Sequence, residues 1–312
     1  MRKLWLRKAS DVDAAAVRLA RTMVAEILNL GGEGGTEARE GWAARLELGF
    51  ARHGARTVLA NRRHLGPLRV QKALYPEGND VCQVIVVHPP AGIVGGDTLA
   101  MDFDAGAGCH VQITTPGAAK WYRASGVGAR ARTTIRIDSG SFVEWLPQEN
   151  LLFDGARATI ALRVDLAGDA RFLGWDVTAL GRTESDERFS AGFLRSTWEV
   201  ARDDALVWCE RGAIDGGSRA LQAPVVLNGA PVFGTMVAAG VAIDDEALAT
   251  LRAAKCSSGP GAAAVTRMPD VFVARYRGDS APAARAYFVT LWQLLRPIYA
   301  GRGAIAPRIW ST

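Results

Sequence analysis

The amino-acid sequence predicts a mainly β protein, with stacked mixed β-sheets in a β-helix-like body and a few helices, including a C-terminal amphipathic one. Three observations support this fold class. Strand-like segments fill residues 41–240, several of them repeat one plan, and helical periodicity is confined to the flanking regions. Alternation of apolar and polar residues with a period of two is typical of half-buried strands.

Composition bounds what the chain can be. Its 312 residues are 49% hydrophobic and 22% charged, which is ordinary for a globular protein with a sizeable core. No apolar run approaches the ~20 residues that cross a bilayer, and charges interrupt the basic N-terminus before a signal-peptide core can form. We therefore expect a cytoplasmic protein that does not bind a membrane. The net charge of +5 is scattered without a basic stripe or motif, so we expect no nucleic-acid partner.

The first forty residues look separate from the rest. Ser10 and Asp13 resemble a capping box, and apolar residues recur at helical spacing as far as Leu28. The segment Gly31–Gly35, GGEGG, then reads as a flexible linker. We expect residues 1–40 to be an N-terminal extension, helix plus linker, attached to a single β domain over residues 41–312.

Individual strands can be placed within that domain. Residues 44–50 alternate roughly with period two, and so do residues 99–103, 133–137 and 159–164. Residues 84–87 form a continuous β-branched run, which is typical of a strand buried on both faces.

A weak internal repeat suggests how the strands are arranged. The segments MDFDAGAGCHVQI, IRIDSGSFVEWL and LRVDLAGDARFLGW each hold a strand ending in Asp, a turn with glycine and a second strand. The acids are Asp104, Asp138 and Asp165. The repeat predicts β-hairpins stacked side by side, each burying one face against the next. Layered sheets or a β-helix-like body follow, rather than alternating βα units.

Two later segments are predicted to be helical. Asp244 can cap a helix over residues 245–255, and Ser280 can cap a longer one whose regular pattern Pro297 ends. The longer helix has a broad apolar stripe, composed of Ala284, Tyr287, Phe288, Leu291, Trp292, Leu294, Leu295 and Ile298. Such a stripe either packs on the sheet or meets a partner protein, and we expect partner contact near Trp292 or the tail that follows.

Motifs for catalysis are missing from the sequence. Cys109 and His110 are adjacent, but on a strand they point to opposite faces and cannot form a nucleophile–base pair. There is no Gly-x-Ser-x-Gly elbow, no pair of histidines at i and i+4, and no CxxC pair among the four cysteines. The cysteines therefore read as buried reduced thiols, and the chain reads as a protein that is not an enzyme.

The segment HPPAGIVGGDTL, residues 88–99, is the most unusual in the chain. A phosphate loop would need Lys after its last glycine, and Asp97 stands there instead. His88 is held extended by the prolines that follow it, and the glycines force tight turns. Asp97 either satisfies loop amides or presents an acid in a narrow polar passage, and residue chemistry alone favours the first.

Several long motifs occur in a fixed order along the chain. They are GPLRVQKALYPEG, HPPAGIVGGDTL, TTPGAAKWYRASG, EWLPQENLLFDGA, GWDVTALGR and the C-terminal PRIW. From about Gly41 to its C-terminus, the sequence resembles the UreD (also UreH) family of urease accessory proteins. Family members usually lack the long N-terminal segment, and they commonly have glycine where this chain has Ala91.

The resemblance implies a maturation factor with a largely β fold and no tightly bound cofactor. Proteins of this type bind apo-urease and recruit UreF, which docks the nickel-carrying GTPase UreG. GTP hydrolysis by UreG then releases nickel toward the urease active site. A polar internal tunnel is the proposed nickel route, so nickel would be bound only transiently.

By motif match, the resemblance assigns two acids to the nickel path. These are Asp97 in GGD and Glu210 in VWCERG. Nickel tolerates oxygen ligands, and a conduit should hold its ion weakly at several sites. Other residues expected to shape the tunnel or a partner surface are His88, Gly95, Gly96, Tyr122, Arg123, Gln148 and Trp292. The alternatives are a protein adaptor that never touches nickel and a small-molecule enzyme that uses the glycine-rich loop.

Overall fold

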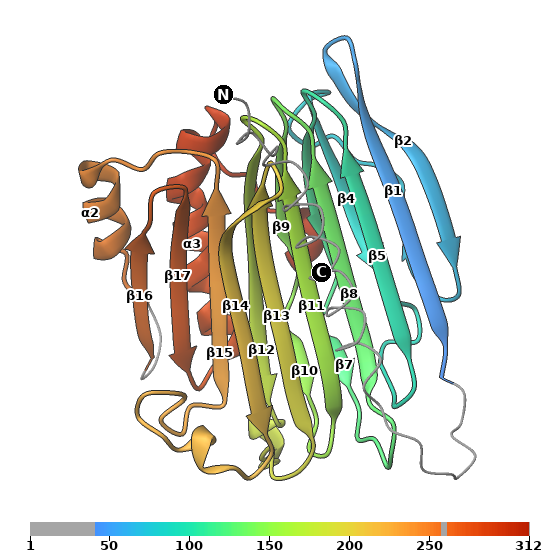
Figure 1. Cartoon of the computed structure of the whole chain (residues 1–312), viewed down its shortest axis with the longest axis vertical. Coiled ribbons are helices and arrows are strands. Elements are labelled where there is room, and N and C mark those ends of the chain that lie inside the picture. The colour runs from blue at the N-terminus through green and yellow to red at the C-terminus, as the bar shows by residue number, and fades with distance from the viewer. Residues whose placement is uncertain (1–40, 257–260, 312) are drawn as a thin grey trace, which may run out of the picture. The chain divides into compact units, whose positions relative to one another are not determined.

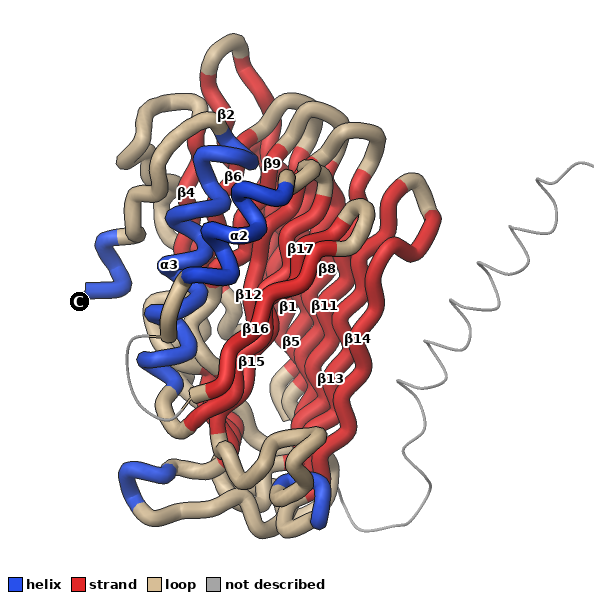
Figure 2. The backbone as a smooth tube through the Cα atoms, turned by 90° about the vertical axis from the view of Figure 1, so that its left-hand side faces the viewer, coloured by secondary structure: helices blue, strands red, loops and turns tan. Residues whose placement is uncertain are grey.

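The computed structural model describes residues 41–256 and 261–311, in which two β-sheets pack face to face (Figures 1 and 2). In spatial order, the first sheet contains β14 (Ala205–Asp215), β13 (Phe193–Arg202), β11 (Arg157–Leu166), β8 (Ala129–Ile137), β5 (Thr98–Ala105), β1 (Ala43–His53) and β2 (Arg56–Leu65). The second contains β16 (Ala262–Arg267), β17 (Val271–Gly278), β15 (Val232–Ala239), β12 (Arg171–Leu180), β9 (Phe142–Leu146), β6 (His110–Thr114), β4 (Val81–Val87) and β3 (Arg69–Val70), while β10 (Asn150–Leu152) joins β12 to β7 (Ala119–Trp121). The predicted fold class of stacked mixed sheets is confirmed, and each expected strand lies within one of these elements.

The repeat seen in the sequence is present in the structure, but its unit is not the β-hairpin that the sequence led us to expect. β5 pairs with β1 and β8 in the first sheet, whereas β6 pairs with β4 and β9 in the second. The turn after β5 therefore carries the chain from one sheet to the other, as do the turns between β8 and β9 and between β11 and β12. The predicted hairpins are wrong, and the repeating unit is an arch whose two strands belong to different sheets.

Backbone hydrogen bonds at the turns explain why the arches stack. The amide of Asp138 donates to the carbonyl of Ala105 at 2.9 Å, and the amide of Ala167 donates to Ile137 at 2.9 Å. Each turn thus bonds to the turn of the preceding arch instead of closing a hairpin on itself. The strands on either side consequently pair in parallel with the neighbouring arch, which is the arrangement of a β-solenoid.

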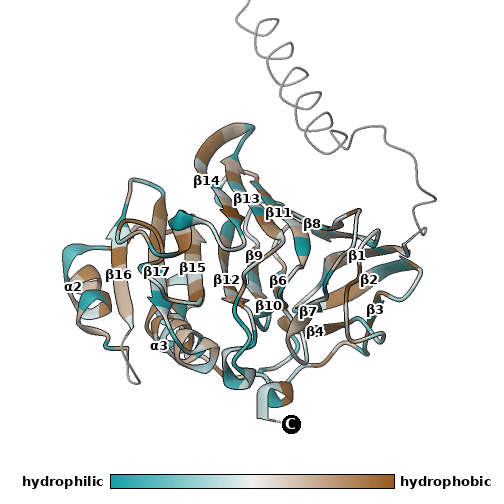
Figure 3. Cartoon of the chain, turned by 90° about the horizontal axis from the view of Figure 1, so that it is seen from below, coloured by the Kyte–Doolittle hydropathy of each residue, from teal (hydrophilic) through white to brown (hydrophobic). Residues whose placement is uncertain are grey.

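The inner faces of both sheets form one core, and the outer face of the second sheet forms another. Inward side chains alternate along each strand, as Leu46, Leu48 and Phe50 do on β1. Figure 3 shows the sheets edge on, with β14 and β16 as the edge strands on the same side of the sandwich. This side is where the two sheets are not joined by an arch.

Helix α3 (Ala281–Ala300) covers the outer face of the second sheet, and α2 (Asp245–Ala253) packs beside β16. Both predicted caps are confirmed: Asp244 accepts from the amide of Ala247 at 2.7 Å, and Ser280 accepts from Ala283 at 3.3 Å. Short 3₁₀ helices occur at η1 (Thr183–Ser185), η2 (Arg219–Leu221) and η3 (Arg308–Ser311). None of the helices in the described part of the chain has the length and apolarity required to span a membrane.

Pro297 does not end the second helix as the sequence pattern suggested. It lies inside α3, which continues to Ala300. The proline removes one donor from the helical ladder, but the following turn buries Tyr299 completely and closes with the left-handed residue Gly301. Burial of that aromatic ring offsets the lost hydrogen bond.

The helix expected at residues 10–30, the linker at 31–35 and the N-terminal extension over residues 1–40 lie outside the described residues.

Candidate functional site

A cavity of about 390 Å³ lies between the two sheets, near the ends of the strands that follow the glycine-rich loop. Its first wall comes from strands β5, β8, β11, β13 and β14, and its second from β4, β7, β9, β10, β12 and β15. Most of the lining is apolar and is built from side chains such as Leu99, Met101, Ile160, Trp121 and Trp145. Polar groups are few, so each of them has a strong influence on what the cavity can bind.

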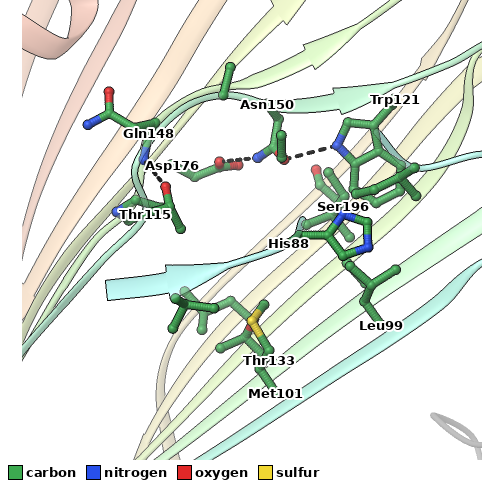
Figure 4. A pocket seen from close by; sticks show the side chains of 18 of the residues that line it. His88, Leu99, Met101, Thr115, Trp121, Thr133, Gln148, Asn150, Asp176 and Ser196 are labelled. Carbon is green, nitrogen blue, oxygen red and sulfur yellow. Dashed lines mark hydrogen bonds between the residues drawn. The ribbon is translucent and has the colours of Figure 1, made fainter. Parts of the chain in front are cut away.

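A row of polar side chains runs along the second wall of the cavity. The indole nitrogen of Trp121 donates to the amide oxygen of Asn150 at 3.0 Å. The amide nitrogen of Asn150 in turn donates to Oδ1 of Asp176 at 2.7 Å (Figure 4). Asn150 is thereby fixed in one orientation, and one oxygen of Asp176 remains without a donor from this row.

Glu210 brings a second carboxylate to the cavity from the opposite sheet. Its Oε1 accepts from the hydroxyl of Thr235 at 3.2 Å, and its Oε2 lies 2.5 Å from a guanidinium nitrogen of Arg275. Enclosure by protein raises the pKa of Asp176 to about 6, and the nearby charge of Glu210 adds to this while the bond from Asn150 opposes it. Two carboxylates that repel each other in this way favour a bound cation.

His88 and Gln148 also line the cavity. Burial lowers the pKa of His88, and the charge of Asp97 opposes this shift without cancelling it. The imidazole is therefore neutral at neutral pH and has a nitrogen lone pair available to a ligand. Gln148 is buried, its backbone amide donates to the Thr115 hydroxyl at 2.8 Å, and its side-chain nitrogen has no hydrogen-bond partner.

Asp97 lies beside the cavity and not among the residues that line it. Its two oxygens accept from the backbone amides of Trp42 at 2.8 Å and Val94 at 2.9 Å. The side chain is 5% exposed, so this acid ties the start of β1 to the glycine-rich loop. This geometry matches the loop-satisfying role that residue chemistry favoured, and a nickel contact at Asp97 stays a prediction.

The two predicted glycines of this loop are required for different reasons, close packing at Gly95 and backbone conformation at Gly96. A Cβ at Gly95 would lie 2.5 Å from the carbonyl oxygen of Val127, and Gly96 has a φ of 93° that favours glycine. Neither residue lines the cavity, so both shape the loop around Asp97 and not the cavity wall.

Tyr122 and Arg123 form part of the surface near the cavity. The ring of Tyr122 meets Phe153 edge-on at 4.8 Å, and it occupies the space that a side chain at Gly92 would need. Arg123 pairs with Asp154 at 2.6 Å and is largely exposed. Of these two predicted residues, Tyr122 supports the loop and Arg123 is available to a partner surface.

Trp292 is not placed as expected, because its side chain is completely buried under the second sheet. Its indole nitrogen donates to Oε1 of Glu144 at 2.6 Å, and Arg296 reaches the same carboxylate at 3.0 Å. His110 completes the group, with its Nε2 3.0 Å from Oε2 of Glu144. The side chain of Trp292 itself is therefore not exposed to a partner, because the sheet covers most of the apolar stripe of α3 and Trp292 joins a buried polar cluster. Partner contact near Trp292 or at the tail that follows stays a prediction.

Comparison with known proteins decides the family. Residues 43–311 match the family model described as UreD urease accessory protein.

The chain belongs to the UreD family of urease accessory proteins.

The chain also matches relatives named urease accessory protein UreD over nearly the whole length of each relative. That of Azoarcus sp. strain BH72 is 50% identical over 275 residues, which cover 88% of this chain and 96% of the relative. That of Dechloromonas aromatica strain RCB is 50% identical over 273 residues, covering 87% and 95%. The relative from Pseudomonas aeruginosa strain PAO1 is 50% identical over 272 residues, again covering 87% and 95%. The chain is thus similar to these UreD proteins throughout its described part.

Sequence reasoning missed two acids that lie within largely apolar strands of this UreD-family chain. Asp176 stands within the apolar strand RFLGWDVTAL, and Glu144 stands within FVEWL. A lone acid in an otherwise apolar strand was the available signal, because an acid there must find partners or be functional. The carboxylate of Glu144 contacts Trp292, Arg296 and His110, whereas that of Asp176 faces the cavity.

The backbone of Ala91 gives a physical reason for the glycine that the family resemblance leads us to expect at this position. Its φ is 62°, in the left-handed region that costs most residues energy. The residue lines the cavity next to Gly92. Glycine would adopt this turn without the cost that the alanine side chain imposes.

Proposed function

We propose that this chain acts in urease maturation as a nickel-delivery scaffold and not as an enzyme. Membership of a family of urease accessory proteins supports the first part of the proposal. The observation that carries the nickel contact is the pair of carboxylates, Asp176 and Glu210, in the cavity between the sheets. Nickel tolerates carboxylate and imidazole ligands, and the cavity offers both.

The geometry supports transient binding of the ion. Asp176 has one engaged oxygen and Glu210 is paired with Arg275, so each gives a cation only part of a coordination shell. A cation placed between them relieves their mutual repulsion, and His88 supplies a neutral nitrogen in the same cavity. Weak, separated ligands let an ion enter and leave again, as a conduit requires.

The partners proposed for this work follow from the family resemblance. They are apo-urease, UreF, and the GTPase UreG bound through UreF, with nickel as the cargo. The cytoplasm expected from the sequence is also part of the proposal. Asp97 is proposed to serve this route by holding the loop that carries His88 and Gly92 beside the cavity.

The test is nickel content of urease produced together with its accessory proteins and variants of this chain. Asp176→Asn and Glu210→Gln each keep the size of the side chain and remove its charge. We expect both to lower nickel per urease active site several-fold while leaving the complex with the accessory proteins intact. Asp165→Asn is the matched control, because Asp165 pairs with Arg163 outside the cavity.

A protein adaptor without nickel contact is the alternative, and the same experiment separates it. Unchanged nickel loading in both cavity variants, with the complex still formed, would leave the scaffold role standing and remove the nickel contact.

A further inference from the structure

Three strands of the second sheet place polar residues in one row on its inner face. Asp176 on β12 is the register partner of Thr235 on β15, and Thr235 is the register partner of Arg275 on β17. Only β16, with Ala264 opposite Arg275, lies between this row and the edge of the sheet. The row therefore leads from the middle of the cavity to the open side of the sandwich.

Glu210 meets the row from the opposite sheet. It belongs to β14, the edge strand of the first sheet, and it contacts Thr235 at 3.2 Å and Arg275 at 2.5 Å. The ion pair thus spans the space between the two sheets where no arch connects them. The Arg275 side chain is 57% exposed and that of Glu210 is 30% exposed, which places the arginine on the solvent side of the pair.

A second cleft, of about 170 Å³, includes Arg275 in its lining. Its lining residues come from both edges and are Trp208, Ala264, Thr266, Met268, Val273 and Arg275. Glu210 lines the inner cavity and not this cleft, whereas Arg275 lines the cleft and not the cavity. The ion pair therefore joins a residue of the cavity lining to a residue of the cleft lining.

We propose that Arg275 and Glu210 form a gate at a lateral opening of the cavity, and that Arg275 must leave Glu210 before a divalent cation can bind there. This inference rests on the proposed function. A guanidinium within bonding distance neutralises the carboxylate and repels a second cation. Because the Arg275 side chain is mostly exposed, it can turn toward solvent, and a cation that binds the buried Oε2 of Glu210 then replaces its charge.

The test is a titration of nickel alone into the full chain, read by equilibrium dialysis. We compare the wild type with Arg275→Gln, Arg275→Lys and Glu210→Gln. Arg275→Gln is expected to tighten nickel binding roughly fivefold, because the competing positive charge is gone. Arg275→Lys keeps a cation at the pair and should stay near the wild type, and Glu210→Gln should weaken binding.

Arg277→Gln is the matched control. Arg277 lies two residues further along β17 and donates to the carbonyls of Pro224 and Val226, away from Glu210. Nickel affinity that is unchanged in Arg275→Gln but weakened in Glu210→Gln would overturn the gate and leave the proposed nickel contact in place. Affinity that is unchanged in both Glu210→Gln and Asp176→Asn would instead remove the nickel contact itself.

Discussion

The indole nitrogen of Trp292 on α3 donates a hydrogen bond of 2.6 Å to the carboxylate of Glu144 on β9, with both side chains fully buried. Arg296, one turn further along α3, pairs with the same carboxylate and with Glu77. Through these bonds, one acid inside the second sheet fixes the position of the helix that covers it.

We expect Glu144→Gln to lower the free energy of unfolding by about 3–5 kcal/mol. The change removes one of the two carboxylates that pair with the buried Arg296 and the charged partner of His110, and breaking a buried ion pair is costly. Urea denaturation followed by circular dichroism measures this loss. Glu47→Gln is the control, since Glu47 pairs with Arg45 on the exposed face, and its effect should stay within about 1 kcal/mol. Equal small effects of the two changes would contradict the structural role of Glu144.

Asp176→Asn should stabilise the fold, and the gain should depend on pH. The folded pKa of about 6 lies above the ordinary value of 3.8, so the folded state is increasingly destabilised as the pH rises from about 4 to 6, and the penalty is constant above that range. Asparagine avoids this cost, and we expect a gain of roughly 2–3 kcal/mol at pH 8. At pH 5 the gain should shrink to about half, because the folded carboxyl is then protonated. Urea denaturation at the two pH values checks this, and a gain independent of pH would refute the assignment.

Removal of Asp97 should destabilise the glycine-rich loop. Asp97→Ala leaves the backbone amides of Trp42 and Val94 without the acceptor of two partly buried hydrogen bonds, at a cost of about 2 kcal/mol. Thermal unfolding and amide hydrogen exchange at these two positions measure the effect. Asp104→Ala is the comparison, because Asp104 is exposed and pairs only with Arg136 among the described contacts. If Asp97→Ala keeps full stability and slow exchange at both amides, the bonds from Trp42 and Val94 to Asp97 do not stabilise the fold.

Ala91→Gly should raise the free energy of unfolding by about 1 kcal/mol, since glycine adopts a φ of 62° without strain. Most alanine-to-glycine changes have the opposite sign, because glycine loses more backbone entropy on folding. Ala167→Gly in the exposed turn after β11 is the control and should lower stability by about 0.5–1 kcal/mol. A lower stability for Ala91→Gly would show that the turn relaxes around alanine.

Strand periodicity was enough to predict the fold class, because inward side chains such as Leu46 and Leu48 alternate regardless of which strand lies beside them. Periodicity could not reveal which strands pair with each other. Asp104 and Arg136 are register partners 32 positions apart, and no local pattern distinguishes such an arch from a hairpin. The turn glycines serve either connection equally well.

The candidate site was predictable only in part, for a similar reason. Glu210 was expected and lines the cavity, yet its partner Arg275 comes from a strand of the other sheet more than sixty residues later. Asp97 attracted attention because its neighbours are small, whereas Asp176 was hidden among apolar residues. A residue stands out in a sequence when its chain neighbours differ from it in chemistry, whereas a site depends on which residues the fold brings together.

The stacked arches have a consequence for how the chain reaches this structure. Most parallel pairings join residues about thirty positions apart, and that of β1 with β5 joins residues 55 apart, so loop closure precedes almost every stabilising contact. Topologies of this kind fold in milliseconds to seconds, far more slowly than helical bundles, and their unpaired edges stay exposed meanwhile. We therefore expect the speed of folding, more than the final stability, to limit the yield of functional protein.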